Sequence, residues 1–155
     1  MQLTRAADYG VRVMIHLAAA GPESRLLLVD LAAATGAPES FLSKVLQALA
    51  RTGLISSRRG QSGGFRISIR GRAASMLDVV EAIDGRISLN VCLVPGKSCR
   101  RKISCPAHPI WAEAQRAMLQ VLGSAKIATL AAESHDAALN HQALEPCALC
   151  QPSLS

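Results

Sequence analysis

The chain has 155 residues and a formal net charge of +6, from 17 Lys and Arg against 11 Asp and Glu, which favours polyanionic partners and suits one compact domain with an extension. Half of its residues are hydrophobic but only 3% are aromatic, a composition that favours packed helices over a sheet-rich core. The sequence has no stretch of about 20 apolar residues and no basic-then-apolar N-terminal pattern, so we expect a cytoplasmic protein without a membrane span.

Three helices are expected in the first 52 residues. Apolar residues recur at three- and four-residue spacing over 3–20, 29–35 and 39–52. The third segment places Phe41 on its apolar, buried side and leaves a polar and basic outer side. Two short helices joined by a Gly-containing turn predict a helix-turn-helix, with an ordinary helical hairpin as the alternative. The residues of the third helix expected to contact DNA are Ser40, Phe41, Ser43, Lys44, Gln47 and Arg51.

A Gly-rich basic loop joins two short β-prone runs after this helix. In the second run Phe65, Ile67 and Ile69 alternate with polar residues, which predicts a half-buried strand. A nucleotide-binding phosphate loop is the alternative, but its Lys-Ser/Thr ending is missing. The hairpin residues expected to contact DNA are Arg58, Arg59, Gly60, Gln61, Ser62, Gly63 and Gly64. A helix-turn-helix followed by a hairpin predicts a winged helix, a mainly α fold with a small β-hairpin.

A further helix is expected after the hairpin. Ser75 is a suitable N-cap, apolar residues follow it as far as Ile83, and Asp84-Gly85 ends the segment. We expect this helix to pack under the winged-helix core.

Four candidate metal ligands lie within seventeen residues of one another. They are Cys92, Cys99, Cys105 and His108. Three thiolates and one imidazole form the ligand set of a metal or iron–sulfur centre. A zinc site has the same ligand types, but the tight Cys-x2–4-Cys knuckles usual for zinc are missing.

The segment that follows these ligands has a broad apolar face. The face is too large for a small domain to cover easily, so we expect a second copy of the chain to bury it. The alternative is that the segment folds back onto its own core. The residues expected at the dimer interface are Ile110, Trp111, Ala114, Met118, Val121 and Leu122.

Several motifs together resemble those of a known family. They are Met1-Gln2-Leu3-Thr4, Gly53-Leu54-Ile55, Gly63-Gly64-Phe65, the run 78–85 and the three-cysteine loop. Over residues 1–132 the chain resembles the IscR-type iron–sulfur transcriptional regulators, whose relatives include NsrR and RirA. The resemblance implies a homodimeric winged-helix factor with a cluster in the cysteine loop and a dimerising helix after it. His108 matches the histidine that completes a 2Fe–2S ligand set in IscR-like proteins, and a 4Fe–4S cluster is the alternative.

We therefore expect a winged helix-turn-helix DNA-binding domain over 1–85, a cluster-binding loop over 86–108, a dimerisation helix over 109–133 and a flexible tail over 134–155. The expected function is that of a dimeric, repressor-like regulator that binds a pseudopalindromic DNA site. Through a 2Fe–2S cluster it would sense redox, iron, nitric oxide or cluster status, and it would not be an enzyme. The alternatives are a zinc-binding winged-helix regulator and a thiol redox enzyme that uses Cys147 and Cys150.

Overall fold

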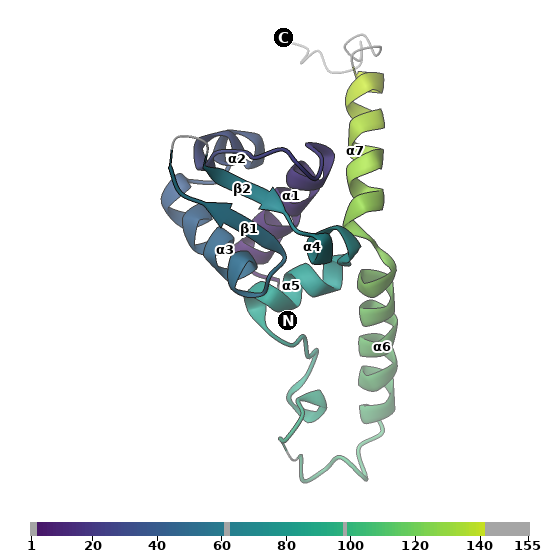
Figure 1. Ribbon diagram of the computed structural model, residues 1–155. Coiled ribbons are helices and arrows are strands. Elements are labelled where there is room, and N and C mark those ends of the chain that lie inside the picture. The colour runs from purple at the N-terminus through teal and green to yellow at the C-terminus, as the bar shows by residue number, and fades with distance from the viewer. Residues whose placement is uncertain (1–2, 61–62, 98, 142–155) are drawn as a thin grey trace, which may run out of the picture.

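The computed structural model describes residues 3–60, 63–97 and 99–141. It has a winged-helix body, with two long helices lying one after the other along its side and a loop below the body (Figure 1). The mainly α fold with a small β-hairpin is confirmed. The helices and strands are α1 (Arg5–Ala19), α2 (Leu28–Thr35), α3 (Glu39–Arg51), β1 (Ile55–Arg58), β2 (Gly64–Ile67), α4 (Ile69–Ala73), α5 (Met76–Asp84), the 3-10 turn η1 (Val91–Leu93), α6 (His108–Ser124) and α7 (Ile127–His141).

The core lies where α1, α3 and α5 pack against one another, and α7 adds a fourth side against α1. Its largest fully buried side chains are Val13, Met14, Leu17, Leu31, Leu42, Leu46, Leu49, Leu54, Val79, Val80 and Ile127. Burial of each such side chain contributes roughly 1.5–3 kcal/mol. Phe41 is an exception to the prediction, because it is 38% exposed. Its ring packs edge-on against Tyr9, with the ring centroids 5.8 Å apart.

The two ends of the winged-helix body are joined at Thr4. Its hydroxyl accepts a hydrogen bond from the Ala7 backbone N–H at 3.2 Å, which caps α1. The same residue donates its backbone N–H and its hydroxyl to the Asp84 carboxylate at 3.1 and 2.5 Å. The first turn of α1 is therefore held against the last turn of α5, where the chain leaves the body for the cysteine loop.

Ser75 caps α5 as predicted. Its hydroxyl accepts from the Asp78 backbone N–H at 3.2 Å, and its own backbone N–H donates to the Asp78 carboxylate at 2.7 Å. This reciprocal pair is a capping box. The hydrogen bonds from the Ser75 backbone and side chain lower the pKa of Asp78. Ser75 thereby starts α5 at a defined residue beside the core.

The wing is a two-stranded antiparallel hairpin in which Ile55 pairs with Ile67 and Arg58 with Gly64. Leu26, before α2, exchanges two backbone hydrogen bonds of 2.9 Å with Phe65 and so anchors β2 to the helical body. The predicted continuation of the strand through Ile69 is wrong.

The strand ends at Ile67 because Ser68 caps the short helix α4. The Ser68 hydroxyl accepts from the Gly71 backbone N–H at 2.9 Å. Ile69 is therefore turned outward and is 92% exposed. A helix cap within the β-prone run overrides the period-two pattern.

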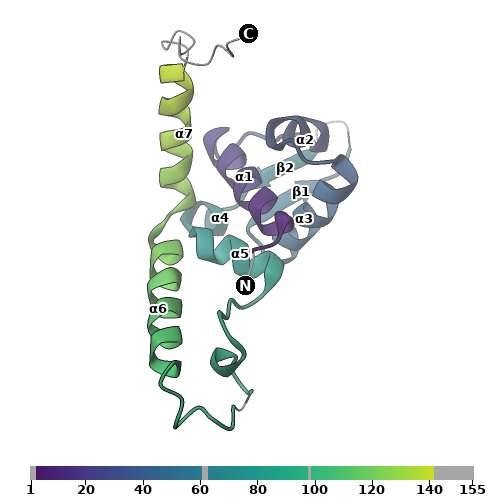
Figure 2. The same ribbon diagram turned by 180° about the vertical axis from the view of Figure 1, so that it is seen from behind.

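The helix expected over 109–133 is two helices. At the break, Ala125 accepts a 2.8 Å hydrogen bond from Met76 N–H, and Ile127 N–H donates to Ala74 at 3.0 Å. These bonds between the chain segments replace helical ones and turn the chain, so that α7 runs along α1 and buries Ile127 and Ala131. Seen from behind, α6 extends away from the body and α7 lies beside it (Figure 2).

The expected flexible tail begins within a helix, because residues 134–141 belong to α7. Cys147 and Cys150 lie outside the described residues. Among the described residues, no helix has the length and apolar character needed to cross a membrane.

The close packing of α4 on the wing gives a test of the fold. A Cβ added at Gly71 would overlap the Leu54 carbonyl oxygen, a backbone atom that cannot move aside easily. We expect Gly71→Ala to lower the free energy of unfolding by at least about 2 kcal/mol. In Gly123→Ala the new Cβ would lie 3.7 Å from Leu77, so this helical control should be neutral or stabilising by up to about 1 kcal/mol. Chemical denaturation measures both, and equal stability of the two variants would contradict the packing.

Candidate functional site

The outer face of α3 is free for contacts. Leu42, Val45, Leu46 and Leu49 bury one side of the helix, and Gly36, in the left-handed conformation with φ 68°, makes the turn that sets α3 against α2. Of the residues predicted to contact DNA, Ser43 is half-buried, and the others on this helix are exposed, namely Ser40, Phe41, Lys44, Gln47 and Arg51. The arrangement is that of a helix-turn-helix with its second helix presented to solvent.

The wing presents cations next to this helix. Arg58, Arg59 and Gly60 are exposed at the end of β1, whereas Gly63 is buried. The turn is closed by Gly63 N–H, which donates to the Gly60 carbonyl at 2.8 Å. Gly64, with φ 121°, lies so close to the Leu26 carbonyl that a Cβ would reach 2.8 Å from its oxygen. The predicted contacts Gln61 and Ser62 lie outside the described residues.

Sequence reasoning missed one residue that holds the wing in place. Arg25 donates to the Gly64 carbonyl at 3.2 Å, from a segment 39 residues earlier in the chain. No local pattern indicates such a contact. Within the wing itself, Arg66 forms an ion pair with Glu23 at 3.3 Å. Arg58 and Arg59 form no ion pair within the described part of the chain. The latter two are therefore the wing cations available to phosphates.

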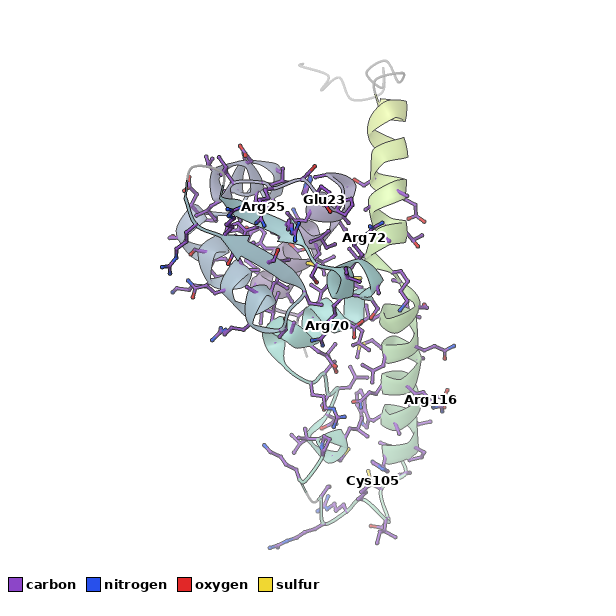
Figure 3. The ribbon with its side chains drawn as sticks, viewed as in Figure 1. Glu23, Arg25, Arg70, Arg72, Cys105 and Arg116 are labelled. Carbon is purple, nitrogen blue, oxygen red and sulfur yellow. The ribbon has the colours of Figure 1, made fainter. Side chains whose placement is uncertain are left out.

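The four predicted ligands line one hollow at the start of α6. Cys92 belongs to η1, Cys99 to the loop, and Cys105 precedes the helix that begins at His108. Figure 3 shows Cys105 at the end of α6 that is farthest from α7. The hollow has a volume of about 300 Å³, and its lining residues are Asn90, Val91, Cys92, Cys99, Lys102, Cys105, His108 and Trp111. Residues separated by up to sixteen positions are thus brought together around one space.

Polar contacts with α6 and within the loop shape this hollow. The Gln115 side chain accepts from Leu89 N–H at 3.0 Å, which attaches the loop to α6. Asn90 accepts from Val91 N–H at 2.7 Å and starts η1. His108 N–H donates to the Cys105 carbonyl at 3.1 Å. These bonds place Cys92 from one end of the loop opposite Cys105 and His108 from the other.

The chemistry of the hollow suits a soft metal centre. The thiols of Cys92, Cys99 and Cys105 are free and half-buried. The Nδ1 atom of His108 is buried and has no hydrogen-bond partner among the residues that the structure describes, a state that costs about 1–3 kcal/mol unless another group satisfies it. A metal atom bound at this imidazole would satisfy it.

The candidate ligands are spread over the wall of the hollow and do not gather at one point. Among the described residues, no three His, Cys, Asp or Glu side chains converge closely enough to hold one metal ion. A zinc ion needs its ligands around one point. An iron–sulfur cluster takes them on two or more metal atoms and fills a larger space, which fits a shared hollow with separated ligands.

The predicted dimerisation residues divide between two faces of α6. Met118 and Leu122 pack against the core of their own chain, and Trp111 lines the hollow. Ile110 and Val121 are 69% and 66% exposed, and Ala114 is exposed as well. The folding-back of the helix onto its own body therefore accounts for one face only. A second apolar face remains open.

The sequence is similar to those of known transcriptional regulators. The model of the Rrf2 family, described as an iron-dependent transcriptional regulator, matches residues 3–133. The chain is 33% identical over 131 residues to the HTH-type transcriptional regulator NsrR of Geobacillus kaustophilus, across 84% of this chain and 89% of that one.

Solved structures show the same fold. CymR, the global cysteine regulator of B. subtilis, matches with a TM-score of 0.70 and 24% identity, across 86% of this chain and 98% of that one. The structure of T. potens IscR matches with a TM-score of 0.66 and 23% identity, across 88% and 90%.

Proposed function

The chain belongs to the Rrf2 family of transcriptional regulators, and from that premise we propose that it is a homodimeric, repressor-like DNA-binding regulator that senses its signal through a 2Fe–2S cluster. The signal is redox state, iron supply, nitric oxide or cluster supply. The observation that carries the proposal is the hollow shared by Cys92, Cys99, Cys105 and His108. The family's description as iron-dependent supports the choice of metal.

The four residues would bind the cluster through two kinds of group. The three thiols would bind it as thiolates, and His108 would bind through its imidazole. When bound, the cluster would supply one-electron redox chemistry and a centre that small reactive molecules can alter. One imidazole among thiolates raises the reduction potential relative to all-thiolate ligation and makes binding sensitive to protons.

The helix α6 connects this hollow to the DNA-binding body. His108 and Trp111 lie at its first turn, and Met118 and Leu122 pack against the core farther along. A change in the loop would shift α6, and α6 contacts α5 beneath the helix-turn-helix. Regulation then requires that the binding free energy for DNA differ by about 1–3 kcal/mol between the protein with its cluster intact and the protein whose cluster is lost or altered.

The open face of α6 supports a two-fold dimer. Ile110, Ala114, Ala117 and Val121 are all exposed and are spaced by four, three and four residues, which places them in one stripe. The spacing reads the same in both directions. Two antiparallel copies would therefore set Ile110 against the partner's Val121 and let the small alanines approach at the crossing point.

The DNA contacts follow from the exposed face of α3 and from the wing. Two copies related by a two-fold axis would place α3 in successive major grooves of a pseudopalindromic site, with Arg58 and Arg59 on the flanking backbone. Gln47, exposed in the middle of α3, has the amide needed for bidentate contact with adenine.

Removal of the imidazole tests the cluster. After anaerobic reconstitution, we expect about one 2Fe–2S cluster per chain by iron, sulfide and visible absorption. His108→Ala should lose the cluster or change its spectrum, because one of four ligands is gone. His108→Cys should retain a cluster with a lower reduction potential. The control His16→Ala removes an imidazole from α1 and should leave the spectrum unchanged. A colourless protein that holds zinc, or a His108→Ala spectrum identical to that of wild type, would contradict the proposal.

Charge in the apolar stripe tests the dimer. We expect the wild-type chain to be a dimer at micromolar concentration by size-exclusion chromatography with light scattering. Ala114→Glu with Ala117→Glu should give a monomer of unchanged helical content, since four like charges would meet at the crossing point. Gln120→Glu, an exposed change on the same helix outside the stripe, should remain dimeric. A wild-type monomer would exclude the interface.

Two kinds of variant separate base reading from phosphate binding. On duplexes selected by the wild-type protein from a random library, Gln47→Ala should cost about 1–3 kcal/mol and relax specificity at one base pair. Arg58→Gln and Arg59→Gln should weaken binding to all duplexes and each lower the salt slope by about 1 per bound site. Arg72→Gln, which removes an exposed arginine of α4, is the control. If it matched the effect of the wing variants, the assigned DNA face would be wrong.

A further inference from the structure

The net positive charge of the chain is concentrated around the hollow. Residues 85–112 contain five basic side chains and no acidic one, whereas the rest of the chain has 12 basic and 11 acidic residues. All five cations are exposed, and they are Arg86, Lys97, Arg100, Arg101 and Lys102. None forms an ion pair within the described residues. Residues 85–112 thus carry a net charge of +5, against +4 for α3 and the wing together, so the charge that first indicates a nucleic-acid partner is divided between these two regions.

One of these cations differs from the others in its position. Lys102 lines the hollow together with the three cysteines, His108 and Trp111, whereas the other four do not. Its backbone N–H donates to the Cys99 carbonyl at 3.0 Å, in the turn that connects Cys99 to Cys105. The lysine is thus placed between two ligand positions by the fold of the loop itself.

We propose that Lys102 is the residue whose charge sets the reduction potential of the bound cluster. This assignment rests on the proposed function, because it needs a cluster in the hollow. A 2Fe–2S core with three thiolates and a neutral imidazole carries about one negative charge when oxidised and about two when reduced. A fixed cation beside it stabilises the reduced form more, and this raises the potential.

The surroundings of Lys102 strengthen its effect relative to the other cations. Lys102 is exposed like the others, but it shares the lining of the hollow with the apolar side chains Val91 and Trp111, and apolar groups screen a charge less than open water does. The positive N-terminal end of the 17-residue helix α6 lies at the same place and acts in the same direction. With no carboxylate between Asp84 and Glu113, the loop itself has no acidic side chain to cancel the lysine charge. The cluster with its thiolates is the anion that the hollow would hold.

The test compares two lysines of one loop. Lys102→Gln and Lys97→Gln remove the same charge from the same side-chain type, but only Lys102 lines the hollow. Each reconstituted protein is titrated anaerobically with dithionite, which supplies one electron per cluster and converts one ferric ion to ferrous. The midpoint potential is then read from the visible spectrum. We expect Lys102→Gln to shift the midpoint potential to more negative values and Lys97→Gln to shift it much less. Lys102→Arg keeps the positive charge and should have the potential of the wild-type protein.

Four results would overturn the assignment or its basis. Equal shifts in the two glutamine variants would show a general effect of loop charge. An unchanged potential in Lys102→Gln would remove the role of the lysine. A Lys102→Gln protein that holds no cluster, while Lys97→Gln and Lys102→Arg hold one, would make the residue necessary for assembly instead. A wild-type protein without iron and sulfide would instead refute the cluster itself, and iron analysis distinguishes this outcome from the other three.

Discussion

The junction between residues 74–76 and 125–127 decides how the two functional parts of this protein are related. Two backbone hydrogen bonds, from Met76 to Ala125 and from Ile127 to Ala74, fasten the end of α6 to the segment that leads into α5. Because α6 is held there and packs its inner face on the core, its free first turn extends away from the body and bears the hollow. Because a helix of this length is a continuous hydrogen-bonded rod, a displacement at the hollow would be passed along α6 to α5 and to the proposed dimer stripe.

The two faces of α6 have different surroundings. The side with Met118 and Leu122 covers the core of its own chain, and the side with Ile110 and Val121 is left apolar and open. An apolar stripe of that kind is costly to expose to water. The proposed dimer and the proposed cluster would both use this helix, and its contact with α5 would connect the cysteine loop to the winged-helix body.

The positions of the basic residues change how the net positive charge of the chain is interpreted. The basic balance of the whole chain suggests a polyanionic partner, yet α3 and the wing, with a net charge of +4, account for only part of the basic excess. In the proposed DNA complex the wing would contribute Arg58 and Arg59, which no carboxylate engages within the described residues. The larger excess surrounds the cysteine hollow, where an anionic cluster would act as its counter-charge.

The sequence by itself determined the elements whose causes are local. Apolar spacing predicted α1, α2 and α3 to within two residues at each end, and Ser75 predicted the start of α5. Residue types alone also selected the four candidate ligands, which line one hollow. Sequence reasoning failed where distant segments meet. The break at Ala125 depends on hydrogen bonds to residues about fifty positions earlier, and the end of β2 depends on a cap at Ser68 within a β-prone run. Only the tertiary structure decided which cation lines the hollow and which side of α6 stays open, because both depend on which segments pack against each other and not on spacing along the chain.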